Sequence, residues 1–588
     1  MLKLLKNFRK REWIYTLICL CLICTQVWLD LKMPDYMSEI TVLVQSENSQ
    51  MSDIIMNGVY MILCALGSLI AAFITGYFVA DIASTFSMNI RKKIFDKVGS
   101  LDIQEVKKFS TSSLITRTTN DVTHVEMFIA TGLQLLIKSP ITAVWAITKI
   151  LNKSFEWSAL TAIAIVILLT IIAIIISIVL PKFKIVQKLI DKLNNVTREN
   201  LTGIRVVRAF NAEEYQKNKF EDVNSELTSL QLFNQKKFAI FQPVMYLVLH
   251  FLTLAIYFVG AYLIKDALMI DKLTLFGDMV VFSSYAMQVI ISFLLLAMIF
   301  MILPRAQVSA ARINEVLDTK ITIKDGSNEY INTKQKGIVE FKNVSFKYED
   351  ADEYLLQDIS FKVNKGETVA FIGSTGSGKS TLINLIPRFY DATDGEVLVD
   401  GVNVKEYKCE DLYNKIGYVP QKAILFNGSV NYNVSYGENA KVQISETKIK
   451  EAIKVAQGKE FVEKMENSYE SHISAGGNNI SGGQKQRLSI ARAIARNPEI
   501  YIFDDSFSAL DYKTDAILRK ELKRYTKDAT TLIVAQRIGT IMNADKIIVL
   551  DEGKCVGQGT HKELLKTCEV YKQIALSQLT KEELENAE

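Results

Sequence analysis

Six runs of apolar side chains, each about as long as a bilayer requires, most constrain how this chain can fold. A membrane-spanning helix needs about 20 mostly apolar residues. The candidate runs lie at residues 13–31, 55–82, 129–150, 157–180, 239–264 and 279–303. The third run is the weakest, because Lys138 and Pro140 interrupt it, yet neighbouring helices can satisfy a carbonyl that proline leaves free. The sequence therefore predicts a helical membrane domain with six spans.

Basic residues in the connecting segments predict the orientation of these spans. Five basic residues precede Trp13, whereas residues 34–53 hold four acidic residues and no basic one. The segments 83–128 and 181–238 are long, rich in Lys and Arg, and expected to be helical. The positive-inside rule therefore places the N-terminus, both long segments and the C-terminal half in the cytoplasm. Charged residues within the spans are sparse, so the sequence indicates no ion relay.

Length, charge and cysteine content exclude several other classes of protein. The 588 residues exceed what one hydrophobic core can hold, and the net charge of +4 gives no general case for nucleic-acid binding. The seven cysteines lack disulfide or zinc spacing, which indicates unpaired thiols in a reducing compartment. Frequent Lys, Ile and Asn residues favour a bacterial source. We therefore expect a multi-pass protein of a bacterial plasma membrane.

A glycine-rich loop is the strongest local motif of the C-terminal half. GSTGSGKST fits the pattern G-x-x-x-x-G-K-[ST], with a strand-like ETVAFI before it and a helix-like TLINLIPRFY after it. Backbone N–H groups of such a loop close on phosphate oxygens at a helix N-terminus. We expect Lys379 to reach the β- and γ-phosphates and Ser380 to ligate Mg²⁺. The loop comprises Gly373, Ser374, Thr375, Gly376, Ser377, Gly378, Lys379, Ser380 and Thr381.

A second motif, IYIFDD, ends in two adjacent aspartates. Its four apolar residues, 500–503, predict a buried parallel strand, and the carboxyl ends of such strands are where α/β sheets place ligands. Downstream of a phosphate-binding loop, the first acid, Asp504, is expected to hold Mg²⁺. The second acid, Asp505, would lie beside the water that attacks a bound nucleotide.

A third motif, ISGGQ, precedes an expected helix. Its hydroxyl and close backbone amides offer a second anion-binding device, since helix N-termini attract negative charge. One nucleotide does not need two phosphate cradles from one chain, so a head-to-tail dimer explains the pair, although an ordinary helix cap would also explain SGGQ seen alone. The residues concerned are Ser481, Gly482, Gly483 and Gln484.

Together these motifs resemble the ATP-binding cassette (ABC) transporter family over nearly the whole chain. The order of six spans and then a cassette looks like an exporter half-transporter. The resemblance implies ATP and Mg²⁺ as cofactors and a helical six-span transmembrane domain followed by an α/β P-loop NTPase domain. We expect the transmembrane domain at 1–320, a linker at 321–337 and the nucleotide-binding domain at 338–588.

Further residues match the family's marks. Tyr348 matches the aromatic that stacks on adenine, and Gln421 matches the glutamine that contacts Mg²⁺ and the attacking water. SALD, which ends at Asp511, matches a loop that communicates across the dimer. The segments 109–122 and 199–220 resemble the coupling elements of exporter cytoplasmic loops.

Two catalytic positions depart from the family pattern. Asp505 stands where a glutamate usually polarises the attacking water, and Gln536 stands where a histidine usually contacts the γ-phosphate. The lost methylene withdraws the carboxylate by roughly 1.5 Å, one C–C bond. A misplacement of about 1 Å can cost about 100-fold in rate. Glutamine cannot carry charge or shuttle a proton as histidine can. We therefore expect ATP binding to survive and hydrolysis to be slow at the site that contains Asp505, Gln536 and Gln421.

This pattern resembles the degenerate subunit of heterodimeric bacterial multidrug exporters. The expected partners are a second ABC half-transporter, the bilayer and a small amphiphilic substrate, with no nucleic acid. A homodimeric exporter of lipid or peptide with slow hydrolysis, an ATP-gated channel or sensor, and a merely anchored soluble-type ATPase are the alternatives. The sequence does not identify the transported compound.

Overall fold

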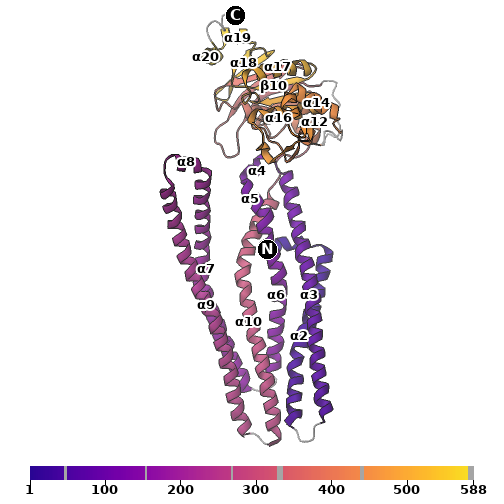
Figure 1. Ribbon diagram of the computed structural model, residues 1–588, viewed down its shortest axis with the longest axis vertical. Coiled ribbons are helices and arrows are strands. Elements are labelled where there is room, and N and C mark those ends of the chain that lie inside the picture. Colours follow the sequence, from indigo (N-terminus) through magenta and orange to yellow (C-terminus); the bar gives the residue numbers. More distant parts are fainter. Residues whose placement is uncertain (46–49, 152–154, 267–268, 327–335, 438–442, 580–588) are drawn as a thin grey trace. The chain divides into compact units, whose positions relative to one another are not determined.

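The computed structural model describes residues 1–45, 50–151, 155–266, 269–326, 336–437 and 443–579 (Figure 1). The chain forms two compact units. The first contains Met1–Ser100 and Phe109–Thr319, and the second contains Leu101–Lys108 and Lys320–Glu588. Most of the expected linker lies outside the described residues, because 327–335 are not among them.

The first unit is entirely helical in the residues that the structure describes. Its helices are longer than the apolar runs, because the helical pattern continues through the segments on either side. They are α1 (Leu2–Leu5), α2 (Lys10–Gln45), α3 (Met51–Ser100), α5 (Thr111–Thr116), a π-helical turn (Arg117–Asp121), α6 (Val122–Leu151), α7 (Phe155–Thr202), α8 (Ile204–Ala209), α9 (Glu213–Asp266) and α10 (Met269–Asp318).

Two sets of helices are visible within this unit. Helices α2, α3, α6 and α10 pack against one another, while α7 and α9 run side by side with α8 at their tip (Figure 1). A shared core joins the two sets, in which Trp157 of α7 and Ile256 of α9 are buried with Phe282 of α10. Large apolar side chains such as Phe73 and Phe258 remain exposed, as expected for helices whose outer faces meet lipid.

The predicted spans correspond to these helices. Six helices within the described residues are long and apolar enough to cross a membrane. The weakest expected run lies in α6, where Pro140 is accommodated inside the helix. Pro181 and Pro304 are likewise inside α7 and α10. The predicted fold class, six apolar helices followed by an α/β ATPase domain, is confirmed.

The second unit is built around two larger sheets and a small two-stranded one. In the described residues the orders are β2-β1-β4-β5, β12-β11-β3-β10-β9-β6 and β7-β8. Strands β11, β3, β10, β9 and β6 run parallel, and β12 is antiparallel at the edge. The strands are β1 (Val339–Phe346), β2 (Leu356–Val363), β3 (Thr368–Gly373), β4 (Asp394–Val399), β5 (Val402–Asn403), β6 (Ile416–Val419), β7 (Gly428–Ser429), β8 (His472–Ile473), β9 (Ile500–Asp504), β10 (Thr530–Val534), β11 (Lys546–Asp551) and β12 (Lys554–Gly559).

Helices surround these sheets, and one of them comes from far earlier in the chain. Helix α4, at Ile103–Lys108, belongs to the second unit although it follows α3 directly in sequence. The α-helices are α4, α11 (Lys379–Asn384), α12 (Cys409–Lys415), α13 (Val430–Val434), α14 (Glu446–Val455), α15 (Lys459–Glu463), α16 (Gly482–Arg496), α17 (Tyr512–Tyr525), α18 (Ile538–Ile541), α19 (His561–Thr567) and α20 (Glu569–Gln578).

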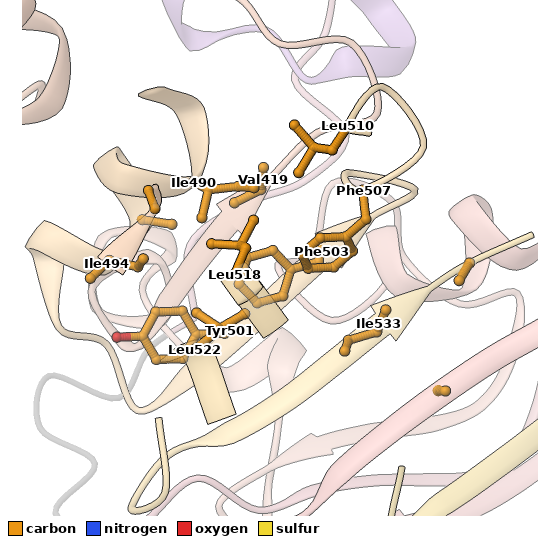
Figure 2. Packing of buried hydrophobic residues seen from close by; sticks show 14 of the residues in the cluster. Val419, Ile490, Ile494, Tyr501, Phe503, Phe507, Leu510, Leu518, Leu522 and Ile533 are labelled. Atoms are coloured by element: carbon orange, nitrogen blue, oxygen red, sulfur yellow. The ribbon is translucent and has the colours of Figure 1, made fainter. Parts of the chain in front are cut away.

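Strand β9 shows why the sequence IYIFD forms a central strand. All five residues are buried. Its side chains alternate between two cores: Ile502 packs in one, and Tyr501 and Phe503 pack in the other. Figure 2 shows Tyr501 and Phe503 against residues of α16 and α17, including Ile494 and Leu522. A strand buried on both faces needs this continuous apolar run, and it holds the following aspartates in a fixed position.

The helix after the glycine-rich loop is shorter than expected. Helix α11 ends at Asn384, although the helix-like sequence runs to Tyr390. Pro387 lies in the segment beyond, and a residue that precedes proline is disfavoured in helical conformation. The chain therefore leaves the helix in a turn, which brings Tyr390 back beside β1.

Candidate nucleotide site

The glycine-rich loop has a backbone that only glycine adopts easily. Gly376 and Gly378 have φ values of 89° and 91°, in the left-handed region. A Cβ added to Gly373 would lie 2.0 Å from the carbonyl oxygen of Leu550, so this position has no space for a side chain. The loop therefore passes close to β11 and presents its backbone amides at the carboxyl end of β3.

Lys379 lies folded over this loop. Its Nζ donates hydrogen bonds to the carbonyl oxygens of Gly373 and Ser374, at 2.9 and 2.7 Å. Burial lowers the pKa of Lys379 below its usual value, and the carboxylates of Asp505 and Asp504 oppose this shift. Among the described residues no carboxylate lies within ion-pair distance of the ammonium. Lys379 is thus a buried cation whose nearest partners are neutral oxygens, as suits a group that meets phosphate.

Ser380 and Asp504 are brought together from two distant motifs. The Ser380 hydroxyl donates to Asp504 Oδ1 at 2.8 Å. Asp504 is 5% exposed, and burial raises the pKa of its carboxyl above the usual range, an effect that the Ser380 hydrogen bond opposes. Mg²⁺ in nucleotide sites is held by one or two carboxylates together with substrate phosphates, rather than by a protein cage. The donor set fits this arrangement, and the described residues contain no cluster of three metal-binding side chains.

Asp505 is held by two amides. Its Oδ2 accepts hydrogen bonds from Gln536 Nε2 at 2.8 Å and from Gln421 Nε2 at 3.2 Å. The residue is 8% exposed and has a φ of 46°, a left-handed conformation that is uncommon outside glycine. The structure therefore gathers all three residues predicted to act in catalysis, and both amides donate to the same carboxylate oxygen.

Tyr348 lies at the edge of this group. Its hydroxyl is 2.9 Å from the hydroxyl of Thr381, the last residue of the loop motif. The ring packs edge-on against Tyr390. Lys107 of α4 donates a hydrogen bond to the Tyr390 hydroxyl at 2.8 Å and lies 6.0 Å from the centre of the Tyr348 ring. Sequence reasoning missed Lys107, because nothing in its neighbourhood distinguishes it from other exposed lysines.

The SGGQ residues form a helix cap and share no hydrogen bond with the glycine-rich loop in the described part of the chain. Ser481 Oγ accepts from the Gln484 backbone N–H at 3.3 Å, and Gln484 Oε1 accepts from the Ser481 N–H at 2.9 Å. This is a capping box at the start of α16. A Cβ at Gly482 would meet nothing within 4 Å, so its backbone is open to a ligand, whereas Gly483 lies against Ala509.

Asp511 also caps a helix. Its Oδ1 accepts from the Thr514 N–H at 2.9 Å at the start of α17, and this hydrogen bond lowers the pKa of the carboxyl. Ser508, in the same loop, donates to the backbone carbonyl of Asp505 at 3.0 Å. The loop that follows the paired aspartates is thus fastened to the catalytic strand at one end and to α17 at the other.

Taken together, these residues of the second unit form a candidate nucleotide site. A buried cation, a hydroxyl–carboxylate pair and a run of backbone amides converge at the carboxyl ends of β3 and β9, where an anionic ligand with a divalent cation fits. In the part of the chain that the structure describes, the predicted second cradle, Ser481 to Gln484, has no hydrogen bond to this group.

The chain matches two protein-family models. The model described as the ABC transporter transmembrane region matches residues 16–293, and the model described as ABC transporter matches residues 356–508. The first match covers the long helices of the first unit. The second begins at β2 and ends beyond the paired aspartates, so it includes the glycine-rich loop and the SGGQ motif.

Several bacterial relatives are similar over most of their length. An uncharacterized ABC transporter ATP-binding protein of Mycobacterium tuberculosis is 38% identical over 518 residues, which are 88% of this chain and 87% of the relative. A putative multidrug export ATP-binding/permease protein of Bacillus subtilis is 33% identical over 85% of this chain and 84% of its own length. An ATP-dependent lipid A-core flippase of Pseudomonas aeruginosa is 32% identical over 86% and 82%.

A solved structure shares the fold. It is described as a bacterial Atm1-family ABC exporter with ATP bound, and it superposes with a TM-score of 0.81. The match covers 97% of this chain and 99% of the other, at 22% sequence identity. The helical unit and the α/β unit therefore have the architecture of a known exporter.

Proposed function

Because the chain belongs to the ABC transporter family, whose members couple ATP at a cassette domain to transport, we propose that it is one half of an exporter. In this proposal it pairs with a second, different half-transporter. It supplies a slow nucleotide site through its own loop and aspartates. It supplies Ser481 to Gln484 to the partner's faster site. ATP closes the two cassettes and turns the membrane helices outward, and hydrolysis resets them.

The hydrogen bonding of Asp505 is the observation that carries this proposal. The side chain is one methylene shorter than glutamate, and two amides hold one of its oxygens. Withdrawal of the carboxylate by roughly 1.5 Å, one C–C bond, would leave an attacking water poorly polarised, since a misplacement of about 1 Å can cost about 100-fold. The two histidines of the second unit that the structure describes have other partners, because His472 bonds Asn427 and His561 bonds Tyr571.

ATP binding is expected to remain intact at the same site. The contacts of Lys379 with the loop, the hydrogen bond between Ser380 and Asp504, and the Tyr348 hydroxyl beside that of Thr381 support this expectation. A site that binds nucleotide tightly but hydrolyses it slowly suits a subunit whose partner performs most of the turnover.

The decisive experiment is isolation of this chain from its native membrane in mild detergent, followed by mass spectrometry of any chain present in equal amount. We expect a second ABC half-transporter that carries Glu and His at the positions of Asp505 and Gln536. Recovery of this chain alone, as a dimer with ATPase activity, would overturn the heterodimer.

A variant of the SGGQ motif provides an independent test. Ser481→Arg should lower the ATPase rate of the whole transporter by about tenfold or more, because it would remove phosphate contacts from the faster site. Thr567→Arg, which introduces the same side chain at an exposed position of α19 whose hydroxyl bonds the backbone carbonyl of Glu563, serves as the matched control. Equal effects of both variants would contradict the assignment of SGGQ to the partner's site.

A homodimeric exporter is the second candidate. It requires Asp505 to act as a slow catalytic base, and the second carboxylate oxygen, which the two amides do not hold, is the atom that would contact the attacking water. For the substrate, amphiphilic compounds are the best-supported class, because relatives are described by name as a lipid A-core flippase and a putative multidrug exporter.

A further inference from the structure

Four helices of the membrane unit bring charged and polar side chains together at one level. The Ser68 hydroxyl of α3 donates to Asp30 Oδ1 of α2 at 2.5 Å, and Lys138 Nζ of α6 lies 3.3 Å from Asp30 Oδ2. Gln288 Nε2 of α10 reaches the backbone carbonyl of Asp30 at 3.5 Å. The sequence indicated no ion relay, because charged residues are sparse within the predicted spans. The structure joins them into one cluster.

A second ion pair lies further along the same helices. Lys149 Nζ of α6 is 2.9 Å from Asp35 Oδ2 of α2. The hydroxyl of Tyr285, a fully buried residue of α10, lies 2.6 Å from Asp35 Oδ1 and 3.0 Å from the carbonyl oxygen of Leu31. We call Asp30, Ser68, Lys138, Gln288, Asp35, Lys149 and Tyr285 the membrane polar cluster.

The first of these pairs lies within the apolar spans. Asp30 is near the end of the first predicted span, while Ser68 and Lys138 are well inside the second and third. Charged side chains are costly in hydrocarbon and therefore face the interior of a bundle or a water-filled path. The side chains of Asp30 and Lys138 are 24% and 33% exposed, so this pair is accessible rather than sealed in the core.

Helix α6 presents further polar groups beside Lys138. Lys138, Thr142 and Lys149 are spaced by four and seven residues, which places them on one face of the helix. The hydroxyls of Thr142 and of the neighbouring Ser139 are buried and have no hydrogen-bond partner among the described residues. Buried hydroxyls without partners are costly, and these two lie within about one helical turn of Lys138.

A purely structural role explains this arrangement less well. An ion pair in a low-dielectric region adds little to stability and is often replaced by apolar residues without loss. Two such pairs together with two unsatisfied hydroxyls are a poor way to fasten helices. Polar residues kept at this cost within a membrane span mark substrate or ion pathways.

We propose that the membrane polar cluster recognises the headgroup of a zwitterionic amphiphile, with an ammonium group at Asp30 and an oxyanion at Lys138. This proposal rests on the export function proposed above and names its substrate class. The charge balance carries it, because Asp30 and Lys138 neutralise each other. A singly charged headgroup that separates them would leave one charge unpaired, whereas a zwitterion satisfies both.

Binding of three matched probes tests the proposal. The transporter, purified with any chain that accompanies it, would be titrated without nucleotide. The probes carry the same fluorescent acyl chain on phosphatidylethanolamine, phosphatidylglycerol or cationic ethylphosphatidylcholine. The variants are Asp30→Asn and Lys138→Met. Asp318→Asn, which breaks the exposed Lys3–Asp318 ion pair in the same unit, is the matched control.

We expect the wild-type protein to bind the zwitterionic probe about tenfold more tightly than either charged probe. Asp30→Asn should make the anionic probe the best ligand, and Lys138→Met should make the cationic probe the best ligand. The control should keep the wild-type order. If the ion pair has only a structural role, both variants should bind all three probes more weakly and to the same extent. That result, or an unchanged order of affinities, overturns the proposal.

Ser68→Ala keeps the test decisive if a charge variant fails to fold. It retains both charges and removes one hydrogen bond to Asp30, so zwitterion binding should fall by about threefold or more; unchanged binding counts against the cluster. ATP-driven movement of the probes in proteoliposomes is measured separately. Absence of transport with the binding order intact would refute export while leaving the recognition site standing.

Discussion

The nucleotide site and the membrane polar cluster hold buried charge in opposite ways. In the nucleotide site Lys379 is held by backbone carbonyls and Asp505 by two amides, and within the residues that the structure describes neither charge has an opposite charge within ion-pair distance. In the membrane polar cluster each aspartate lies beside a lysine from another helix. A site that leaves its charges to neutral partners is prepared for a ligand that brings countercharge. A site that neutralises itself selects a ligand with both charges.

The largest expected effect tests the role of Lys379 in the nucleotide site. Lys379→Ala should weaken binding of fluorescent ATP by at least about 100-fold, because the phosphates lose two or more charge-assisted hydrogen bonds of about 1.5–3 kcal/mol each. Equilibrium titration of the purified transporter measures this. Lys546→Ala, which removes a lysine that bonds the carbonyl of Lys362 away from the loop, should bind normally. Unchanged affinity in Lys379→Ala would refute the assignment of the loop.

The second largest expected effect is on the ATPase rate and concerns Asp505, whose carboxylate two glutamine amides hold. In a Ser481→Arg background, which we expect to silence the partner's site, Asp505→Glu combined with Gln536→His should raise the remaining ATPase rate about 10- to 100-fold. The longer carboxylate reaches the water, and the histidine restores a contact to the γ-phosphate. Steady-state hydrolysis measures the rate, with Asp528→Glu at an exposed turn as control. No gain would mean that these two residues are not what limits turnover.

Single and double replacements at Asp35 and Lys149 test whether the charges of the membrane polar cluster neutralise each other. Either Asp35→Asn or Lys149→Met alone should lower the free energy of unfolding by about 1–2 kcal/mol, less than a fully buried pair because the lysine is 36% exposed. The double variant should recover to within about 0.5 kcal/mol of the wild type, since both members of the cross-helix pair are removed together and Lys32, 3.9 Å from Asp35 Oδ2 on the same helix, is 37% exposed. Thermal unfolding in detergent compares all three. Additive losses would show that the two residues act independently.

The smallest effect concerns the pH dependence of Asp504. Burial raises the pKa of this carboxyl in the folded state above its unfolded value. The folded protein therefore carries a penalty at neutral pH, which is relieved as the pH falls through the raised pKa. Without Mg²⁺ or nucleotide, Asp504→Asn should raise Tm at pH 7 by about 2 °C, and the gain should shrink as the pH falls through the raised pKa. Asp528→Asn should show no such change, and a gain that grew on acidification would have the wrong sign.

The catalytic motifs could be located in the sequence because each is short and contiguous. GSTGSGKST predicts a phosphate-binding loop, and IYIFDD becomes a specific sign of a Mg²⁺ ligand only because it follows that loop in the chain. The parallel strands then bring Ser380 to Asp504. The hydroxyl contact between Tyr348 and Thr381 likewise joins two residues that were each identified from their local sequence. The end of α11 was misjudged, because helical periodicity continues past the position where Pro387 disfavours the helix.

The sequence by itself determined the six apolar helices, the nucleotide-binding fold and the two unusual residues at 505 and 536, because these depend on periodicity and on motifs a few residues long. Only the tertiary structure decided that Gln421 and Gln536 hold the same oxygen of Asp505, and that Asp30, Ser68 and Lys138 meet. The physical reason is that the packing of separate elements, the strand ends of the sheet in one case and the helices α2, α3 and α6 in the other, sets which side chains face one another. A one-dimensional pattern carries no information on that choice when the residues involved are single and widely spaced.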